Sequence, residues 1–305
     1  MLRAMTADPQ PVTAARPRAG PPGDPPGSAP PAGRAAGVAM MLGSGLSNQT
    51  GAAVAALAFP VVGPAGVVAV RQWVAGAVLL AAGRPRMRTF TREQWWPVLG
   101  LAAVFAVMNL SLYTAIGRIG LGLAVTLEFL GPLAVALAAT RRRADLVCAL
   151  AAGAAVVVLT RPRPAADYAG VALALLAAVC WACYILLGRT VGRRLPGVQG
   201  PAAAAAVSAL AYVPVGAVVL AHRPPTAAAI GYAVTAGVLS SAVPFLADLL
   251  ALRRVPARLF GTFMSVNPVL AALVGLIVLD ESPGPYEWAA ITVIVTANAV
   301  VVTRR

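Results

Sequence analysis

Long apolar runs separated by short polar segments recur along the chain from about residue 35 to its end. Each run is long enough for an α-helix to cross about 30 Å of hydrocarbon. The pattern predicts ten membrane-spanning helices, at about 35–59, 64–82, 95–116, 120–139, 144–160, 167–187, 201–221, 227–249, 256–279 and 285–302. Residues 1–33 are rich in Pro, Gly and Ala, with few large apolar side chains, and are predicted to be a disordered cytoplasmic tail.

Composition and charge support an all-α membrane protein. Hydrophobic residues make up 59% of the chain, whereas soluble domains have about 45 to 50%. The net charge of +14 comes from 24 basic residues, all of them arginine. With the N-terminus in the cytoplasm, nineteen arginines fall in predicted inner segments and four in outer ones. Because inner loops collect positive charge, this split predicts ten spans with both termini inside, and it assigns the basic excess to topology rather than to nucleic-acid binding.

Several kinds of chemistry have no support in the sequence. The chain has no lysine, so it cannot contain the Gly-Lys-Ser/Thr of a nucleotide-binding P-loop. Cys180 and Cys183 lie inside an apolar span, and with one histidine in the chain they are expected to be apolar packing residues. We therefore predict no enzyme, no metal and no cofactor. A membrane-embedded enzyme acting on lipid-linked substrates is the alternative class, but the dispersed carboxylates offer it no catalytic cluster. A passive assembly partner would leave the charges within the spans unexplained.

Short matching stretches 136 residues apart indicate an internal repeat. Gly131-Pro132 aligns with Asn267-Pro268, and Asp145 aligns with Glu281. Each half contains five predicted spans, an odd number, so the second half must begin on the opposite side of the membrane. The sequence therefore predicts two inverted five-helix repeats, at 34–163 and 164–305, with a substrate site near the membrane midplane between them. The alternative is a chance alignment of short segments rich in Ala and Leu.

Glu128 lies in an apolar span, four residues before Pro132. Proline has no amide hydrogen, so the helical hydrogen bond to the Glu128 carbonyl is missing and a kink is expected there. Pro268 frees the carbonyl of Met264 in the same way. In lipid, a freed carbonyl and a carboxylate must both face protein or a water-filled cavity. Glu128 is therefore a candidate proton carrier, and the alternative is a structural ion pair with Arg71.

Other polar side chains within spans are candidates for the same cavity. On the eighth span, Ser241, Pro244 and Asp248 are spaced to share one helix face, and Pro244 predicts a further kink. Asp248 has an alternative role as partner of Arg253 or Arg254 near the cytoplasmic surface. The candidate substrate-binding or coupling residues are Glu128, Arg71, Asn109, Tyr113, Asp248 and Asn267. Three further amides are expected to be hydrogen-bonded links between helices: Asn48, Gln49 and Gln72.

Two stretches resemble a known family: LGLAVTLEFLGPLAVAL at 121–137 and SSAVPFLADLLALRRVPARLFGTFMSVNPVLAALVGLIVLDE at 240–281. Together with ten spans in two repeats, they resemble the EamA-type branch of the drug/metabolite transporter superfamily, and most of all its bacterial threonine and homoserine exporters. The resemblance covers about residues 35–303. That subgroup often has an acidic residue before the second proline, where this chain has Asn267, so no carboxylate partner is expected there.

The resemblance implies an inner-membrane exporter of amino acids or related small metabolites. Its central cavity between the repeats would open alternately to each side of the membrane. Transport would be driven by the proton gradient or by the gradient of the substrate itself. The expected partners are a small-molecule substrate, protons and membrane lipids, with no nucleic acid. An exporter or importer of drugs or other metabolites of the same superfamily is the alternative function.

Overall fold

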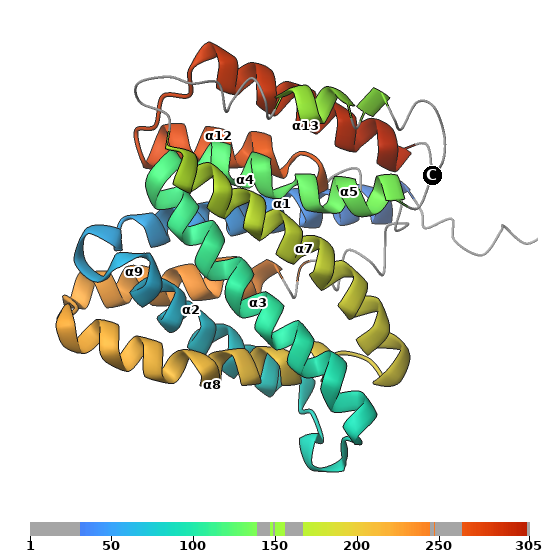
Figure 1. Cartoon of the computed structure of the whole chain (residues 1–305), viewed down its shortest axis with the longest axis vertical. Coiled ribbons are helices and arrows are strands. Elements are labelled where there is room, and N and C mark those ends of the chain that lie inside the picture. The colour runs from blue at the N-terminus through green and yellow to red at the C-terminus, as the bar shows by residue number, and fades with distance from the viewer. Residues whose placement is uncertain are drawn as a thin grey trace, which may run out of the picture.

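The computed structural model describes residues 31–138, 147–148, 150–155, 167–244, 247 and 264–303. Within these ranges the chain is helical and contains no β-strand (Figure 1). The first part comprises α1 (Pro31–Ala56), α2 (Phe59–Gly83), the 3₁₀ turn η1 (Met87–Thr89), α3 (Arg92–Ile119), α4 (Leu121–Glu128) and α5 (Leu130–Ala138). The second comprises α7 (Tyr168–Arg194), α8 (Gln199–His222), α9 (Ala227–Gly237), the π-helical turn η2 (Val238–Ala242), α12 (Asn267–Val278) and α13 (Pro285–Thr303).

Five described helical segments are long and apolar enough to cross a membrane: α2, α3, α4 with α5, α7 and α8. Segments 227–242 and 267–278 are shorter apolar helices. Each lies in or close to one predicted span, because a run of apolar side chains is what fixes both the helix and its burial in lipid. Helix α1 begins at Pro31, within the last residues of the range 1–33 that the sequence predicts to be a tail. The count of ten spans stays a prediction.

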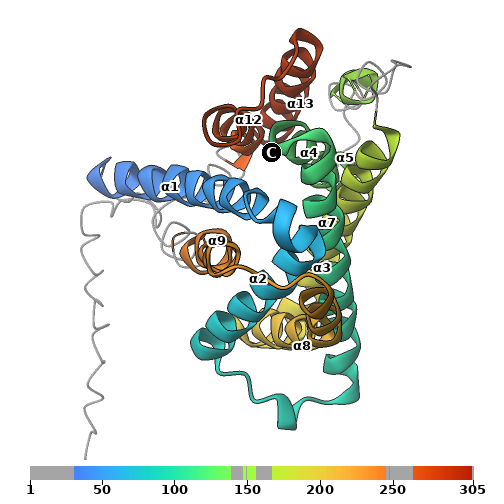
Figure 2. The same ribbon diagram turned by 90° about the vertical axis from the view of Figure 1, so that its left-hand side faces the viewer.

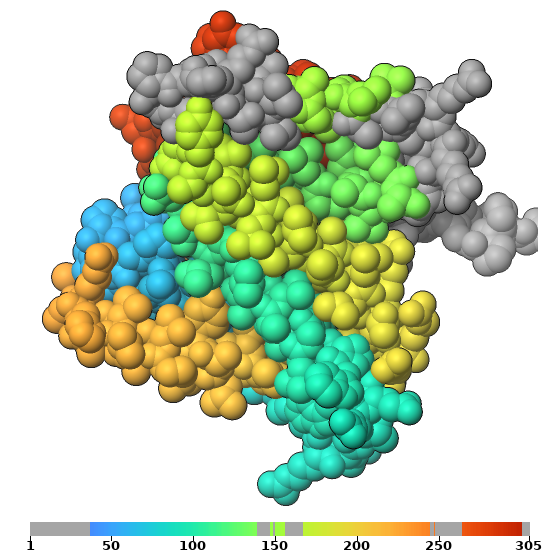
Figure 3. Space-filling model, in the orientation of Figure 1, coloured from blue at the N-terminus to red at the C-terminus, as the bar shows by residue number. Residues whose placement is uncertain are grey.

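The helices pack in pairs that are distant in sequence. Helix α3 runs along α7, and α2 runs along α8. Helix α1 packs against α9, η2 and α12, and α12 crosses α4 (Figure 2). The space-filling view shows α7 and α3 lying diagonally across one face, with α8 beside them (Figure 3).

Small residues form the contact between α2 and α8, which we call the α2–α8 seam. A Cβ added at Gly76 would lie 2.7 Å from the Cβ of Ala209. Gln72 crosses the same seam and donates from Nε2 to the hydroxyl of Ser208 at 2.6 Å, which confirms its prediction as a link between helices. Gly and Ala let helix backbones approach closely in lipid, where packing rather than water exclusion holds helices together.

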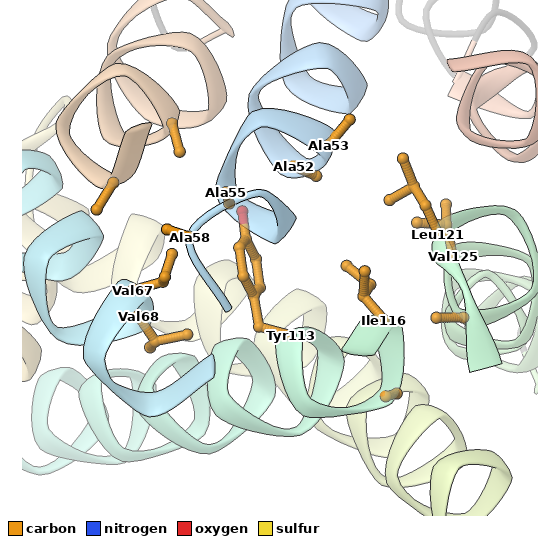
Figure 4. Packing of buried hydrophobic residues seen from close by; sticks show 14 of the residues in the cluster. Ala52, Ala53, Ala55, Ala58, Val67, Val68, Tyr113, Ile116, Leu121 and Val125 are labelled. Carbon is orange, nitrogen blue, oxygen red and sulfur yellow. The ribbon is translucent and has the colours of Figure 1, made fainter. Parts of the chain in front are cut away.

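A second packed region joins α1, α2, α3 and α4. Tyr113 reaches from α3 toward Ala55 of α1 (Figure 4). Its ring also meets that of Phe59 on α2 edge-on, with centroids 6.3 Å apart. Ile116, Leu121 and Val125 are buried members of the same apolar cluster. These side chains belong to one buried apolar cluster to which α1, α2, α3 and α4 all contribute.

Each of three prolines lacks the amide hydrogen that would bond to the carbonyl four residues earlier in a regular helix. Helix α4 ends at Glu128 and α5 begins at Leu130, so the helical segment is interrupted four residues before its proline at position 132. Helix α12 begins at Asn267, directly before Pro268. Pro244 follows the π-helical turn η2. These interruptions expose backbone groups to neighbouring side chains instead of to lipid.

Candidate functional site

A cavity of about 310 Å³ lies where α1, α2, α3, α4, α7, η2 and residues 264–267 meet. Its size is at the lower end of the range for small-molecule sites. Five of the six candidate substrate-binding or coupling residues line it, together with Pro244 and the amides of Asn48 and Gln49: Arg71, Asn109, Tyr113, Glu128 and Asn267. Pro132 and Pro268 lie one turn or less from lining residues and shape the helix ends. Asp248 lies outside the described residues.

Arg71 is held by neutral partners from two other elements. Its Nη1 donates to the Oδ1 of Asn109 on α3, and its Nη2 donates to the carbonyl of Ser240 at 3.4 Å. That carbonyl is available because Pro244 has no amide hydrogen to donate to it. The guanidinium carbon also lies 4.9 Å from the centre of the Tyr113 ring, a cation–π distance. The guanidinium is therefore fixed in the cavity wall while it keeps its charge.

Glu128 faces the same cavity from the end of α4 and is 6% exposed. Among the described residues, no ion pair within 4 Å joins it to Arg71; the one pair found there is Arg118 with Asp167, at 3.0 Å. The structural ion pair considered from the sequence is thus not formed in this structure. A guanidinium and a carboxylate line one cavity without neutralising each other by direct contact.

Amide side chains connect α1 to the start of α12. Gln49 donates from Nε2 to the Oδ1 of Asn267 at 3.4 Å. The Nδ2 of Asn267 donates to the carbonyl of Met264 at 3.0 Å, which is the carbonyl that Pro268 leaves without an amide donor. Asn267 thus completes the helix break that the repeat predicts, and it presents its amide at the cavity wall.

Two serines connect α1 to η2. The hydroxyl of Ser47 donates to a carbonyl of η2 at 2.8 Å, and the hydroxyl of Ser240 donates to the carbonyl of Asn48 at 3.2 Å. Regular α-helical spacing predicts Ser241 on the face of Pro244, but it is Ser240 that lines the cavity with Pro244. The π-helical turn explains the difference, since the wider turn shifts every later side chain around the helix relative to α-helical spacing.

Aromatic side chains form an opposing wall that was not predicted. The rings of Phe129 and Trp181 meet edge-on with centroids 4.7 Å apart, and those of Phe105 and Tyr184 are 6.2 Å apart. All four line the cavity. In an apolar span an aromatic residue fits lipid, core or cavity equally well, so only the packing of α7 against α3, α4 and α5 identifies them.

The arrangement suits a small zwitterion. One cationic group and one anionic group face a common space whose wall also carries amides, hydroxyls and aromatic rings. Among the described residues, no group of three or more His, Cys, Asp or Glu side chains could hold a metal ion.

The chain matches known proteins over most of its length. The model of the EamA-like transporter family matches residues 168–303. The threonine/homoserine exporter RhtA of Escherichia coli (strain K12) is 37% identical over 267 residues, covering 86% of this chain and 89% of that protein. RhtA of Salmonella typhimurium (strain LT2) is 37% identical over 258 residues, or 83% and 86% of the two chains. A crystal structure with 23% sequence identity shares the fold, with a TM-score of 0.55 over 90% of this chain and 99% of that one.

Proposed function

Because this chain belongs to the EamA-like transporter family, we propose that it exports small hydroxyl-bearing amino acids, of the threonine and homoserine type, through the cavity described above. It is a transporter rather than an enzyme, and a multi-pass protein of the bacterial inner membrane. The observation that carries the proposal is the pair of opposite charges, Arg71 and Glu128, that line one cavity without pairing.

Each charged group has a counterpart in an amino acid. The substrate carboxylate binds at Arg71, whose guanidinium offers a planar set of donors, with Asn109 beside it. The substrate ammonium binds at Glu128, and the side-chain hydroxyl binds at the amides of Asn48 and Asn267. An apolar amino acid of similar size has no hydroxyl to pair with the polar groups of this wall, and a polar pocket rejects such substrates for that reason.

The two halves of the chain are proposed to be inverted five-helix repeats, at 34–163 and 164–305. Helix α3 packs against α7 and α8, while α9 packs against α1 and α2. The offset of 136 residues exchanges these two sets of contacts. Gln72 and Ser208 are also 136 positions apart and are hydrogen-bonded directly. Equivalent residues touch in this way only beside a two-fold axis, so the observation supports ten spans in two repeats.

Alternating access follows from that arrangement. With both termini in the cytoplasm, the buried cluster of Ile116, Leu121, Val125 and Val274 lies between the cavity and the outer surface. The described state is then closed to the outside, and substrate loads from the cytoplasm. Rocking of one repeat against the other would open the outer end and close the inner one.

Glu128 is proposed to couple this movement to protons. A carboxylate that holds the substrate ammonium releases it on taking up a proton, so an external proton can replace the substrate when the outer end opens. The amino acid gradient alone would drive export without this exchange. Glu128→Gln distinguishes proton-coupled export from export driven by the amino acid gradient alone, because an amide cannot carry a proton at this position.

The test is radiolabelled threonine uptake into everted membrane vesicles with a pH gradient, acidic in the lumen. We expect gradient-dependent threonine uptake that excess unlabelled homoserine competes and excess leucine does not. Glu128→Gln should abolish gradient-driven uptake and leave the folded yield nearly unchanged. Absence of gradient-sensitive flux for both threonine and homoserine would contradict a proton-coupled exporter.

A further inference from the structure

A carboxylate outside the cavity caps a helix that belongs to the other half of the chain. Glu281 lies between α12 and α13, and both of its carboxylate oxygens accept the backbone amide of Leu121, at 3.0 and 2.9 Å. Leu121 is the first residue of α4, 160 positions earlier. The N-cap residue of α4 is Gly120, which has no side chain to accept this hydrogen bond. A distant carboxylate therefore satisfies the positive end of α4.

The carboxylate lies in a socket built from both halves. At Gly120 the backbone φ is +83°, and a Cβ there would lie 3.0 Å from a carboxylate oxygen of Glu281. A Cβ at Gly275 would lie 2.5 Å from the same oxygen. The amide of Glu281 donates to the Gly275 carbonyl at 3.1 Å, which fixes the turn. Two glycines, one from α12 and one before α4, thus make room for one charged group.

The socket lies where the two halves touch. At the second residue of α4, a Cβ at Gly122 would lie 2.8 Å from the Cα of Ala272 on α12, so the two helices are in close contact. With both termini in the cytoplasm, residues 120 and 281 lie at the outer end of the molecule, on the far side of the cavity from the cytoplasm. A movement that opens this end must separate α4 from the turn between α12 and α13.

We propose that Glu281 is an outer latch, whose carboxylate holds α4 to the α12–α13 turn while the cavity faces the cytoplasm and releases α4 when the outer end opens. The latch rests on the proposed alternating access, and it touches no substrate. The competing account is a static cap that stays in place through the whole cycle. The two accounts differ in one observable, the side of the membrane from which the cavity can be reached.

Accessibility of a cavity cysteine measures that observable. The native thiols are first replaced by alanine, at Cys148, Cys180 and Cys183, and Ala52→Cys is introduced in the cavity wall. A membrane-impermeant methanethiosulfonate is then added to intact cells or to everted vesicles. We expect Glu281→Gln to raise the labelling rate from outside about five- to tenfold, as expected for weakened hydrogen bonds to a charged group, and to lower the rate from inside.

Glu287→Gln is the matched control. The Glu287 carboxylate accepts the amide of Gly284 at 2.7 Å and so caps its own helix, α13, within one turn. It should leave both labelling rates unchanged. A lowered melting temperature for Glu281→Gln with unchanged labelling would identify a static cap and overturn the latch. Where Glu281→Gln fails to fold, Gly275→Ala serves instead, because its methyl group displaces the carboxylate, and the same shift in labelling is expected.

The two proposals fail separately. Threonine export by the cysteine-free parent tests the transport function without reference to Glu281. If the parent exports threonine but Glu281→Gln leaves the labelling rates unchanged, the latch is overturned and the transport function is not. Loss of gradient-driven threonine flux in the unmodified protein overturns the transport proposal on which the latch rests.

Discussion

Two consecutive residues of α2 have opposite surroundings. Gln72 is 1% exposed and donates to Ser208 across the α2–α8 seam. Arg71 lines the cavity, and within the described part of the chain its Nε has no hydrogen-bond partner. At Gln72 the partner set is complete, because its amide donates to the Ser208 hydroxyl within the seam. The neighbouring Trp73 also contacts α8 at Gly216, and its indole Nε1 has no partner among the described residues. The cavity face keeps a charge and a donor unused, as expected of a surface that binds a ligand.

Gln72 and Arg71 show how a structural polar residue differs from a functional one in a membrane interior. Composition does not do this, since arginine and glutamine in a span are both costly and both need partners. What differs is whether the hydrogen-bonding groups of the side chain already have partners within the protein. Changes in the α2–α8 seam should therefore act on folding, and changes on the cavity face should act on transport.

The largest effect is expected for Arg71→Gln. Hydrogen bonds to charged groups contribute about 1.5 to 3 kcal/mol, so losing the guanidinium should weaken threonine transport by about 10- to 100-fold. The measurement is the initial rate of threonine uptake against its concentration in everted vesicles. A normal KM in a well-folded Arg71→Gln protein would rule out this residue as the carboxylate site.

Gly76→Leu should give the opposite result. The added side chain must displace Ala209, and overpacking of this kind costs about 1 to 3 kcal/mol. We expect a lower folded yield and melting temperature, measured by size-exclusion chromatography after heating, with a normal KM in the protein that folds. A change in KM without loss of stability would mean that the α2–α8 seam takes part in substrate binding.

A smaller effect, on thermal stability, is expected when two tyrosines are each changed to phenylalanine. Tyr212 donates from its hydroxyl to the carbonyl of Ala106 at 2.9 Å, so Tyr212→Phe should cost about 1 kcal/mol of stability. The Tyr113 hydroxyl has no partner among the described residues, so Tyr113→Phe should leave thermal stability unchanged. Equal losses in melting temperature for the two variants would contradict this contrast.

The smallest effect is expected at the surface. Asp167 caps α7 by accepting the Gly170 amide at 2.8 Å and pairs with Arg118. The Gly170 amide, and after it Arg118, lower the pKa of the Asp167 carboxyl below its ordinary value. A lowered folded-state pKa stabilises the protein above about pH 4, and this contribution is lost as the pH falls through the folded pKa. The melting temperatures of wild type and Asp167→Ala, measured against pH, should therefore converge on acidification.

The sequence predicted the helices better than their partners. Apolar runs placed the helices because length and hydrophobicity alone decide what fits a bilayer. The break before Pro132 was predictable too, because a missing amide acts locally. The partners of Arg71 were not, since Asn109 and the Ser240 carbonyl reach it only through tertiary packing.

Two other features of the cavity could not be predicted from residue spacing along the chain. The π-helical turn moved Ser240 to the cavity, in place of Ser241, and nothing in the spacing signals a π-helical turn. The aromatic wall, which includes Trp181 and Tyr184, depends on which face of α7 meets α3. The amide of Asn267 was predicted as a candidate from its place beside a proline, and the structure adds its bond to the Met264 carbonyl.

The most direct test of the substrate site is binding of radiolabelled threonine to the purified protein in detergent. It compares wild type with Arg71→Gln and Gln72→Leu, two changes at consecutive positions of one helix. The account predicts saturable binding by wild type, loss of binding in Arg71→Gln, and wild-type affinity in the fraction of Gln72→Leu that folds. Threonine binding that survives Arg71→Gln with unchanged affinity would contradict the central claim that this cavity is the substrate site.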